Sequence, residues 1–171
     1  KIKTNFDKYS RVSNGEGLTG RSVAEMILKG HGIYDVAVDR VRGSLTDHYD
    51  PAHKVLRLSD PVFDSTSIAA LGIAAHECGH AIQHHESYAP LKFRNAIVPA
   101  ANLGSNLSFL FIFIGLFAFE PLIKLGIALF AITVLFQLLT LPVEYDASRR
   151  AKAILADGVL SGEEMVVVER I

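Results

Sequence analysis

Apolar positions are unevenly distributed along the chain, and they are densest between residues 102 and 141. The stretch "LGSNLSFLFIFIGLFAF" (103–119) contains no charged residue, and the run "LIKLGIALFAITVLFQLLTL" (122–141) contains only Lys124. Each run has about the 17 to 20 residues that a helix needs to cross a bilayer. A buried hairpin of a soluble protein would show one polar face, and residues 109–119 show none. The pattern therefore predicts a transmembrane helical hairpin over 102–141 that turns at Glu120-Pro121.

The segment before the hairpin combines helical and strand patterns. Residues 18–32 show apolar positions at helical spacing, with Thr19 as N-cap and Gly30 or Gly32 at the end. Alternating valines over 34–41 indicate a strand. The sequence "SLTDHYDPAHKVLRLS" (44–59) predicts a β-hairpin that turns at Asp50-Pro51 and returns along residues 55–58.

Two further helices are expected. The first is rich in Ala and Gly, begins at a cap on Asp64 or Ser65, and ends at His85. The second is amphipathic and would begin at Pro142 and end at Gly158. Beyond it, Ser161 and Glu164 form a capping-box pattern that predicts a last helical segment.

These elements predict an α+β membrane protein in which a small sheet and a central helix form one region beside a transmembrane hairpin. We expect that first region over 1–101, the transmembrane hairpin over 102–141 and a helical return segment over 142–171. The 171 residues suffice for a sizeable core. The chain begins with lysine rather than methionine, so we expect it to be a processed or internal portion of a longer protein.

Composition narrows the function classes. A formal net charge of -1 gives no electrostatic reason to expect a nucleic-acid partner. Half of the residues are hydrophobic, which agrees with a chain that lies partly in a lipid bilayer. Cys78 is the only cysteine, which excludes an intrachain disulfide and a zinc site built from cysteines.

The central helix contains a candidate metal motif, "AAHECGHAIQ" (74–83). His76 and His80 lie four residues apart, so both imidazoles project from one side of the helix and can reach one ion. Glu77 stands beside them, where it can act on metal-bound water. These three are the only charge-bearing side chains from 68 to 82, a costly concentration of polarity unless they serve each other.

A catalytic zinc usually takes three protein ligands, so one more is required. The predicted hairpin leaves and re-enters the same side of the membrane, which brings Glu144 back to the side of the metal motif. Asp146 is the next choice for the third ligand. Two positions along a helix correspond to about 200°, so Glu144 and Asp146 cannot both face the ion.

Two alternatives remain open. Intramembrane site-2-type proteases also contain a His-Glu-x-x-His helix but take the third ligand from a Leu-Asp-Gly motif, for which Asp157 followed by Gly158 is the nearest match here. Gly158 is better explained as a helix C-cap. The second alternative is a non-catalytic membrane scaffold with a structural, four-ligand zinc site, to which His48 would add a ligand. Glu77 would have no purpose in such a site.

The chain resembles the YugP-type membrane zinc metallopeptidases of bacteria along nearly its whole length. The matching segments are "GLTG", "DHYDP", "VLRLS", "AAHECGHAIQ", "RNAIVPAANLGSNLS" and "VEYDASRRA". The layout is similar to that of HtpX-type proteases, which implies a zincin-like catalytic region over 1–101 and a third zinc ligand in the return segment over 142–171. The resemblance implies one Zn²⁺ per chain bound by His76, His80 and Glu144, with Glu77 as general base. HtpX-type chains have an aspartate at the position of Ser148. A carboxylate partner for a zinc histidine is therefore not expected at this position.

The same resemblance implies a polypeptide substrate, most naturally a membrane-associated one, while the oligomeric state stays open. Zinc proteases of this kind hold the substrate extended along an edge strand, for which we expect Val55, Leu56 and Arg57. His48 and Tyr49 are candidates to donate a hydrogen bond to the developing oxyanion, although a structural role in the hairpin explains them better. We expect a multi-pass protein of the cell membrane with its active site in the cytoplasm, because basic residues are concentrated at the two ends of the hairpin and scarce at its turn.

Overall fold

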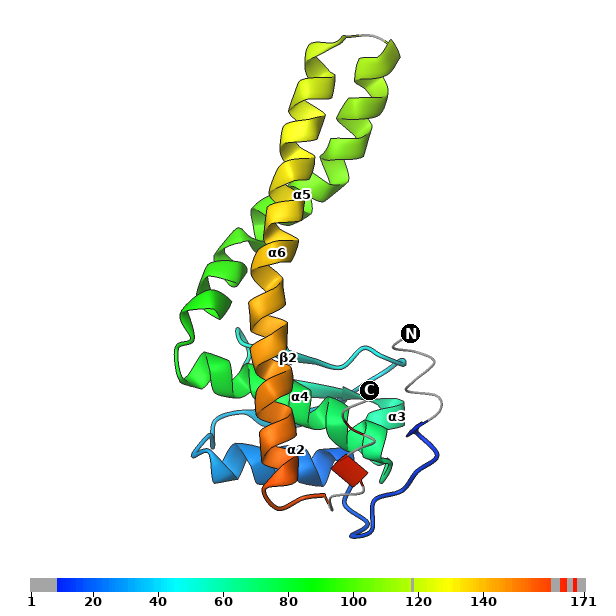
Figure 1. The fold of residues 1–171 in the computed structure, drawn as a ribbon, viewed down its shortest axis with the longest axis vertical. Helices are drawn as coiled ribbons and strands as arrows, with labels where there is room; N and C mark the ends of the chain where they lie inside the picture. Colours follow the sequence, from blue (N-terminus) through cyan, green and yellow to red (C-terminus); the bar gives the residue numbers. More distant parts are fainter. Residues whose placement is uncertain (1–8, 118, 161–163, 166–167, 169–171) are drawn as a thin grey trace. The chain divides into compact units, whose positions relative to one another are not determined.

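A computed structural model describes residues 9–117, 119–160, 164, 165 and 168. The chain divides into two compact units (Figure 1). The first combines Lys1–Glu86 with Asp146–Ile171, and the second is Ser87–Tyr145. The C-terminal segment thus shares a unit with the region that contains the metal motif, although the two are far apart in sequence.

The first unit contains a three-stranded sheet in the order β1-β3-β2. Strand β2 (His48–Asp50) pairs antiparallel with β3 (Val55–Ser59), which confirms the predicted hairpin. Strand β1 (Ala37–Val41) pairs parallel with β3 along its other side. The prediction that residues 55–58 form an edge strand is therefore wrong. The pairing with β1 joins segments that a local pattern cannot relate, which is why the sequence did not reveal it.

Three helices pack with this sheet. Helix α2 (Gly20–Gly30) has Thr19 as N-cap, as predicted, with its side chain accepting from the backbone of Ser22. A short helix not predicted from sequence, α3 (Asp60–Phe63), follows β3. Helix α4 (Ile68–His85) ends as expected but begins later than predicted, because Ser67 rather than Asp64 or Ser65 accepts from the backbone of its first turn.

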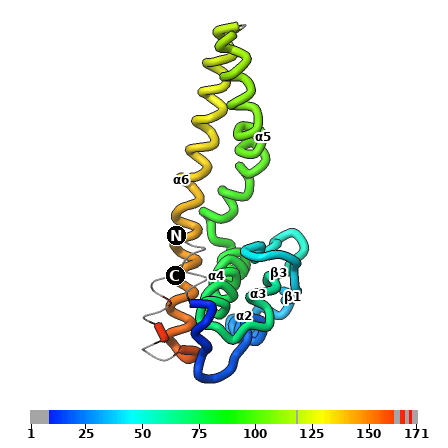
Figure 2. Tube along the Cα trace, turned by 90° about the vertical axis from the view of Figure 1, so that its right-hand side faces the viewer, coloured from blue at the N-terminus to red at the C-terminus, as the bar shows by residue number. Residues whose placement is uncertain are grey.

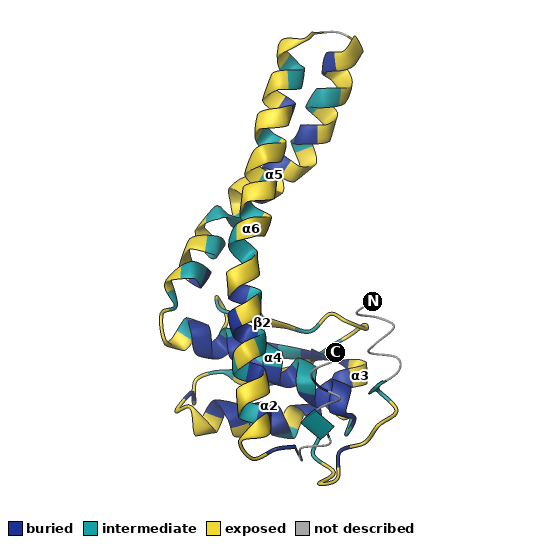
Figure 3. Cartoon of the chain, viewed as in Figure 1, coloured by how far each residue is buried: buried dark blue, intermediate teal, exposed yellow. Residues whose placement is uncertain are grey.

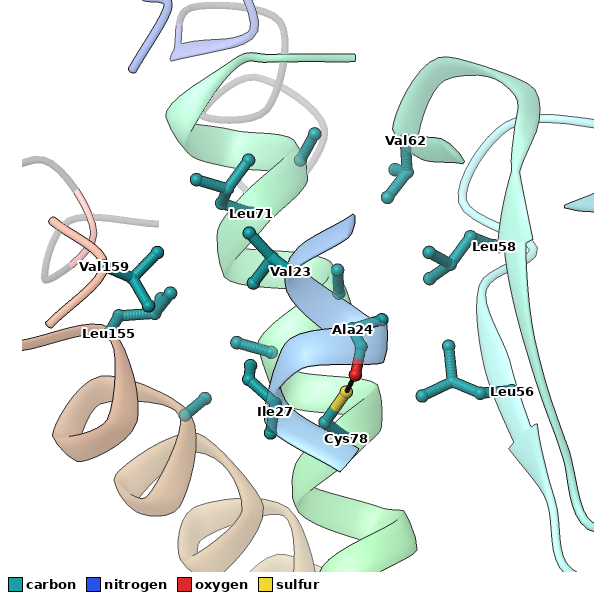
Figure 4. Close-up of a cluster of buried hydrophobic side chains, with 14 of the residues drawn as sticks. Val23, Ala24, Ile27, Leu56, Leu58, Val62, Leu71, Cys78, Leu155 and Val159 are labelled. Carbon is teal, nitrogen blue, oxygen red and sulfur yellow. Dashed lines mark hydrogen bonds between the residues drawn. The ribbon is translucent and has the colours of Figure 1, made fainter. Parts of the chain in front are cut away.

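The core of the first unit surrounds α2 and α4. Figure 4 shows Leu155 and Val159 on one side of these helices and Leu56, Leu58 and Val62 on the other. All five are buried, Leu56, Leu58, Val62 and Leu155 completely. Full burial of such a side chain stabilises the fold by roughly 1.5 to 3 kcal/mol. The part of α6 after Asp146 is thereby fixed against α4, the helix that carries the metal motif.

The second unit contains helix α5 (Ala89–Phe117) and most of α6 (Pro121–Ala156), connected by a short turn. Two glycines allow their backbones to approach closely. A β-carbon on Gly104 would lie 3.0 Å from the carbonyl oxygen of Leu129, and one on Gly126 would lie 2.8 Å from that of Ser108. Small residues at helix crossings are typical of helices that associate within membranes.

Both helices are long and apolar enough to cross a membrane. Their large apolar side chains are mostly exposed, as the colouring of Figure 3 shows. Phe109, Phe113 and Phe117, for example, are 67%, 64% and 79% exposed. Exposed apolar surface of this extent is typical of a surface that contacts a membrane or another protein.

Helix α6 continues through Pro142 without interruption, as Figure 2 shows. The prediction that a separate helix begins at Pro142 is therefore wrong. Proline removes one backbone donor, but helices in apolar surroundings tolerate it when neighbouring groups replace the lost bond. The predicted capping box at Ser161 lies outside the described residues.

Candidate metal centre

Helix α4 presents three polar side chains from an otherwise apolar surface. His76, Glu77 and His80 are half-buried, whereas Ala74, Ala75, Cys78 and Ala81 around them are fully or almost fully buried. The imidazole centroids of His76 and His80 lie 4.9 Å apart in a T-shaped arrangement. One turn of helix separates the two residues, so the helix itself sets this spacing.

Glu144 completes a group of three possible metal ligands. One ligand atom each from His76, His80 and Glu144 lies within 4.8 Å of the other two. Zinc binds nitrogen and carboxylate oxygen at about 2.0 to 2.2 Å, so small adjustments of these side chains would bring all three onto one ion. Two histidines and a glutamate are also the donor set of several catalytic zinc sites. The residues present therefore fit a zinc ion.

Each histidine has a second partner at its other ring nitrogen. Nδ1 of His76 lies 3.1 Å from the hydroxyl of Ser148, and Nδ1 of His80 lies 3.1 Å from the amide oxygen of Gln83. Partners of this kind orient ligand imidazoles. They leave Nε2 of both rings as the metal-binding atom.

Ser148 stands at the position where HtpX-type proteases have an aspartate. It comes from α6, four residues after Glu144 and one turn further along the same helix. The hydroxyl contacts a zinc-motif histidine directly. A serine can orient the ring but, unlike a carboxylate, adds no negative charge.

A cavity of about 330 Å³ opens beside His76 and Glu77. Its walls are mainly apolar and include Leu45, Ile73, Ala151 and Val168, with Gly72 on the α4 side. Asp47 and Lys152 add two charges to the lining. Asp47 is fixed in place by Ser59, whose backbone N–H and hydroxyl donate to its carboxylate at 2.7 and 2.8 Å.

The hairpin residues proposed from sequence lie elsewhere. His48 is exposed on β2, its Nδ1 is 2.8 Å from the carbonyl oxygen of Thr46, and the metal group found among the described residues does not include it. The hydroxyl of Tyr49 lies 2.8 Å from Nδ1 of His84. Burial, followed by the charges of Asp35 and Asp50, raises the pKa of Tyr49 to about 12, so its phenol stays neutral.

Strand β3 is equally unsuited to the role predicted for it. Val55, Leu56 and Arg57 are paired with β1 on one side and β2 on the other. Leu56 is completely buried in the core. The guanidinium of Arg57 donates to Asp50 at 2.9 Å and closes the hairpin. Because both sides of these residues are already hydrogen-bonded, a substrate strand cannot add to them.

Asp157, the ligand of the alternative intramembrane site, directly follows the end of α6. It is exposed and lines a separate cavity with Met26 and His31. The group of metal ligands identified within the described part of the chain contains Glu144 instead. Gly158 has a φ of +152° and follows the helix end, in keeping with a C-cap role.

Cys78 lies within the zinc motif but points away from the metal group. Its thiol contacts the carbonyl oxygen of Ala24 on α2 at 3.7 Å, and it is completely buried (Figure 4). Burial, followed by the charge of Glu77, raises the pKa of this thiol far above its usual range. Cys78 is therefore a packing residue.

Sequence reasoning missed the partners of the metal group. Gln83 follows His80 by three residues and is completely buried, and Asp146 is only 6% exposed. A glutamine in an apolar helix next to a metal motif is a signal that could have been used, since buried amides require hydrogen-bond partners. Leu45 and Asp47, which line the cavity, gave no such signal.

Comparison with known proteins supplies the family. The family model described as "Putative neutral zinc metallopeptidase" matches residues 1–171. The chain is 50% identical over 167 residues to a protein of Bacillus subtilis (strain 168) named "Putative membrane protease YugP", covering 96% of this chain and 74% of that protein. No solved structure matches the chain. The match along the full length, with the His-Glu-x-x-His helix inside it, means that the chain belongs to the family of putative neutral zinc metallopeptidases.

Proposed function

We propose that this protein is a membrane-bound, zinc-dependent endopeptidase. The observation that carries the proposal is the group of His76, His80 and Glu144, together with an apolar cavity that His76 and Glu77 line. A purely structural zinc site has four protein ligands and no need for a further carboxylate beside the ion. Three ligands next to a cavity leave room for water and substrate.

The residues of the chain suggest a general-base mechanism. When bound, zinc acts as a Lewis acid that makes water nucleophilic near neutral pH and polarises the carbonyl to be attacked. Glu77 accepts a proton from the attacking water and then delivers it to the amide nitrogen that leaves. The bond between carbonyl carbon and amide nitrogen breaks, and the products are a carboxylate and an amine. His76, His80 and Glu144 are the residues that would hold the ion.

The cavity and the sheet suggest how a polypeptide would bind. The walls formed by Leu45, Ile73, Ala151 and Val168 favour an apolar substrate side chain next to the scissile bond. The order β1-β3-β2 leaves β2 at an edge of the sheet, where an extended backbone can add. His48 and Tyr49 lie on that strand and stay proposals for substrate contacts.

Membrane topology follows from the two candidate spans. Two crossings return the chain to the side from which it left, so both ends of the hairpin face the same compartment. Basic residues lie at these ends and only Lys124 lies near the turn, which supports a cytoplasmic active site by the positive-inside rule. We infer a multi-pass protein of the cell membrane that acts on membrane-associated polypeptides. The basic residues are Lys92, Arg94, Arg149, Arg150 and Lys152.

Replacement of Glu77 by glutamine tests the proposal. Glutamine keeps size and polarity but cannot accept the proton, and general-base catalysis contributes roughly 10² to 10⁴ in rate. The purified variant in detergent should retain one zinc per chain and lose hydrolysis of a model membrane substrate. A variant that cleaves at the native rate would contradict the role of Glu77. A native protein that binds zinc but cleaves no peptide would favour the scaffold.

A further inference from the structure

Gln83 is a completely buried amide whose two ends are both engaged. Its Nε2 donates to Oδ2 of Asp146 at 3.0 Å, and its Oε1 lies 3.1 Å from Nδ1 of His80. A buried amide without partners would cost free energy, so this arrangement determines how the side chain is oriented. Gln83 therefore connects a carboxylate on α6 to a zinc-motif histidine on α4.

Asp146 is surrounded by donors. Arg149 donates from Nη2 to Oδ1 at 2.6 Å, and Arg150 donates from Nε to Oδ2 at 2.7 Å. Arg150 also donates from Nη1 to Glu86, just beyond the end of α4, at 2.7 Å. Two guanidinium groups within hydrogen-bond distance stabilise the ionised form of the carboxyl group. An ionised carboxylate has no proton to donate and can only accept.

Because the carboxylate of Asp146 can only accept, it determines which group donates and which accepts in each hydrogen bond from Asp146 to His80. Because Asp146 only accepts, the NH₂ group of Gln83 must face it, and the amide oxygen must face His80. A carbonyl oxygen also only accepts, so Nδ1 of His80 must carry a proton. In a neutral imidazole the proton on Nδ1 leaves Nε2 with its lone pair, which is the form that binds a metal.

We propose that Asp146, acting through Gln83, is a positioning residue that holds His80 as its Nδ1–H tautomer and presents Nε2 for metal binding. The inference rests on the proposed zinc site. It adds that the tautomer and the orientation of His80 are already set in the metal-free protein. It also explains why Asp146 is not the third ligand: both of its oxygens are already used by Gln83, Arg149 and Arg150.

His76 provides an internal contrast. Its partner Ser148 is a hydroxyl, which can donate or accept. Ser148 can therefore orient the ring of His76 without selecting a tautomer. The two ligands of one helix thus differ in the partner at Nδ1, which is a hydroxyl for His76 and, for His80, an amide that is linked to a charged carboxylate.

Zinc affinity in three variants tests the proposal. Gln83→Met removes the connection, and Asp146→Asn allows the Gln83 amide to turn around, because an asparagine can donate as well as accept. Loss of an outer partner of a zinc ligand typically weakens metal binding about 10- to 100-fold. We expect a loss of this size in both single variants, measured in detergent by competition with a chelator. Gln137→Met, the same change at an exposed position of α6, is the control and should bind zinc normally.

The double variant Gln83→Glu with Asp146→Asn exchanges amide and carboxylate along the same path. The carboxylate introduced at position 83 would then accept both from His80 and from the amide introduced at position 146. The oxygen of that new amide would take the place of Oδ1 and accept from Arg149, whereas its NH₂ group would take the place of Oδ2, where the Nε–H of Arg150 loses its acceptor. The carboxylate at position 83 still accepts from His80, so the proton stays on Nδ1. We expect zinc affinity to recover in part, to a value above that of both single variants. Rescue separates the proposal from simple misfolding, which the double change would not repair.

Nitrogen NMR of histidine-labelled, metal-free protein gives a second readout that is independent of activity. His80 should be the Nδ1–H tautomer in the native protein and the double variant, and a mixture of tautomers in Asp146→Asn. Unchanged zinc affinity in both single variants, or a double variant no better than they are, would overturn the proposal. Because these experiments measure binding and tautomer, they stand apart from the Glu77→Gln assay: a protein that binds zinc through this network but cleaves nothing would refute only the peptidase function.

Discussion

Gly79 of α4 lies directly against the backbone of Ala147 of α6. A β-carbon on Gly79 would lie 2.8 Å from the carbonyl oxygen of Ala147 and 3.1 Å from its Cα. Gly79 fills a spacer position of the zinc motif, between Glu77 and His80. The absence of a side chain there allows α6 to approach the two histidines closely enough for its own polar residues to reach them.

Gly79→Ala should therefore separate the two helices where the metal group forms. Overpacking of a tight contact costs roughly 1 to 3 kcal/mol. We expect a lower midpoint of thermal unfolding together with weaker zinc binding. Gly72→Ala is the matched control on the same helix, since a β-carbon on Gly72 would meet nothing within 4 Å. Equal zinc binding in both variants would show that the contact does not set the metal geometry.

Glu144→Ala should abolish stoichiometric zinc binding, because it removes one of three ligands. Asp157→Ala removes a carboxylate a few turns further on and should leave the metal content unchanged, as expected for an exposed residue beyond the end of the helix. Metal analysis of the two purified proteins decides between the site that contains Glu144 and the intramembrane alternative. Full zinc occupancy without Glu144, combined with loss in Asp157→Ala, would reverse the assignment.

The sequence predicted the parts of the site that depend on local spacing. The shared face of His76 and His80 follows from helix geometry alone. The expected return of the hairpin made Glu144 a candidate, with Asp146 as the next choice, and the resemblance then favoured Glu144. The position of β3 between β1 and β2 could not be predicted in the same way, because the parallel pair depends on contacts between distant segments. Pro142 indicated a helix start, since proline is common at the first helical position, but here it lies inside a helix. The roles of Gln83 and Asp146 depend on where α6 packs, which no local pattern contains.

The apolar cavity predicts substrate preference. Cleavage of a peptide library should be enriched for sites with an apolar residue next to the scissile bond, identified by mass spectrometry of the products. Gly72→Leu would place a large side chain in the cavity and should shift the preference toward smaller residues. Zinc content is measured in parallel, so that a change in specificity is separated from loss of the metal. An unchanged preference in Gly72→Leu would mean that this cavity does not receive the substrate.

Cys78 should resist thiol reagents in the folded protein. It is completely buried between α4 and α2, so neither access nor formation of a thiolate is favourable. Iodoacetamide should label the native protein negligibly and the denatured protein completely, as measured by intact mass. Tyr34→Cys, introduced at a position that is 80% exposed, gives the positive control. Rapid labelling of Cys78 in the native protein would show that the contact between α2 and α4 opens readily.

The orientation of the hairpin can be tested in intact cells. The ion pair between Lys124 and Glu120, whose charged groups lie 3.2 Å apart, is at the turn that the positive-inside rule places outside the cytoplasm. A cysteine introduced at Glu120 should therefore react with a membrane-impermeant maleimide added to the cells, and one introduced at the exposed Lys152 should react only after the membrane is permeabilised. Buried Cys78 provides a low background in both. If Lys152→Cys reacts in intact cells and Glu120→Cys does not, the active site faces outward and the proposed cytoplasmic substrates are excluded.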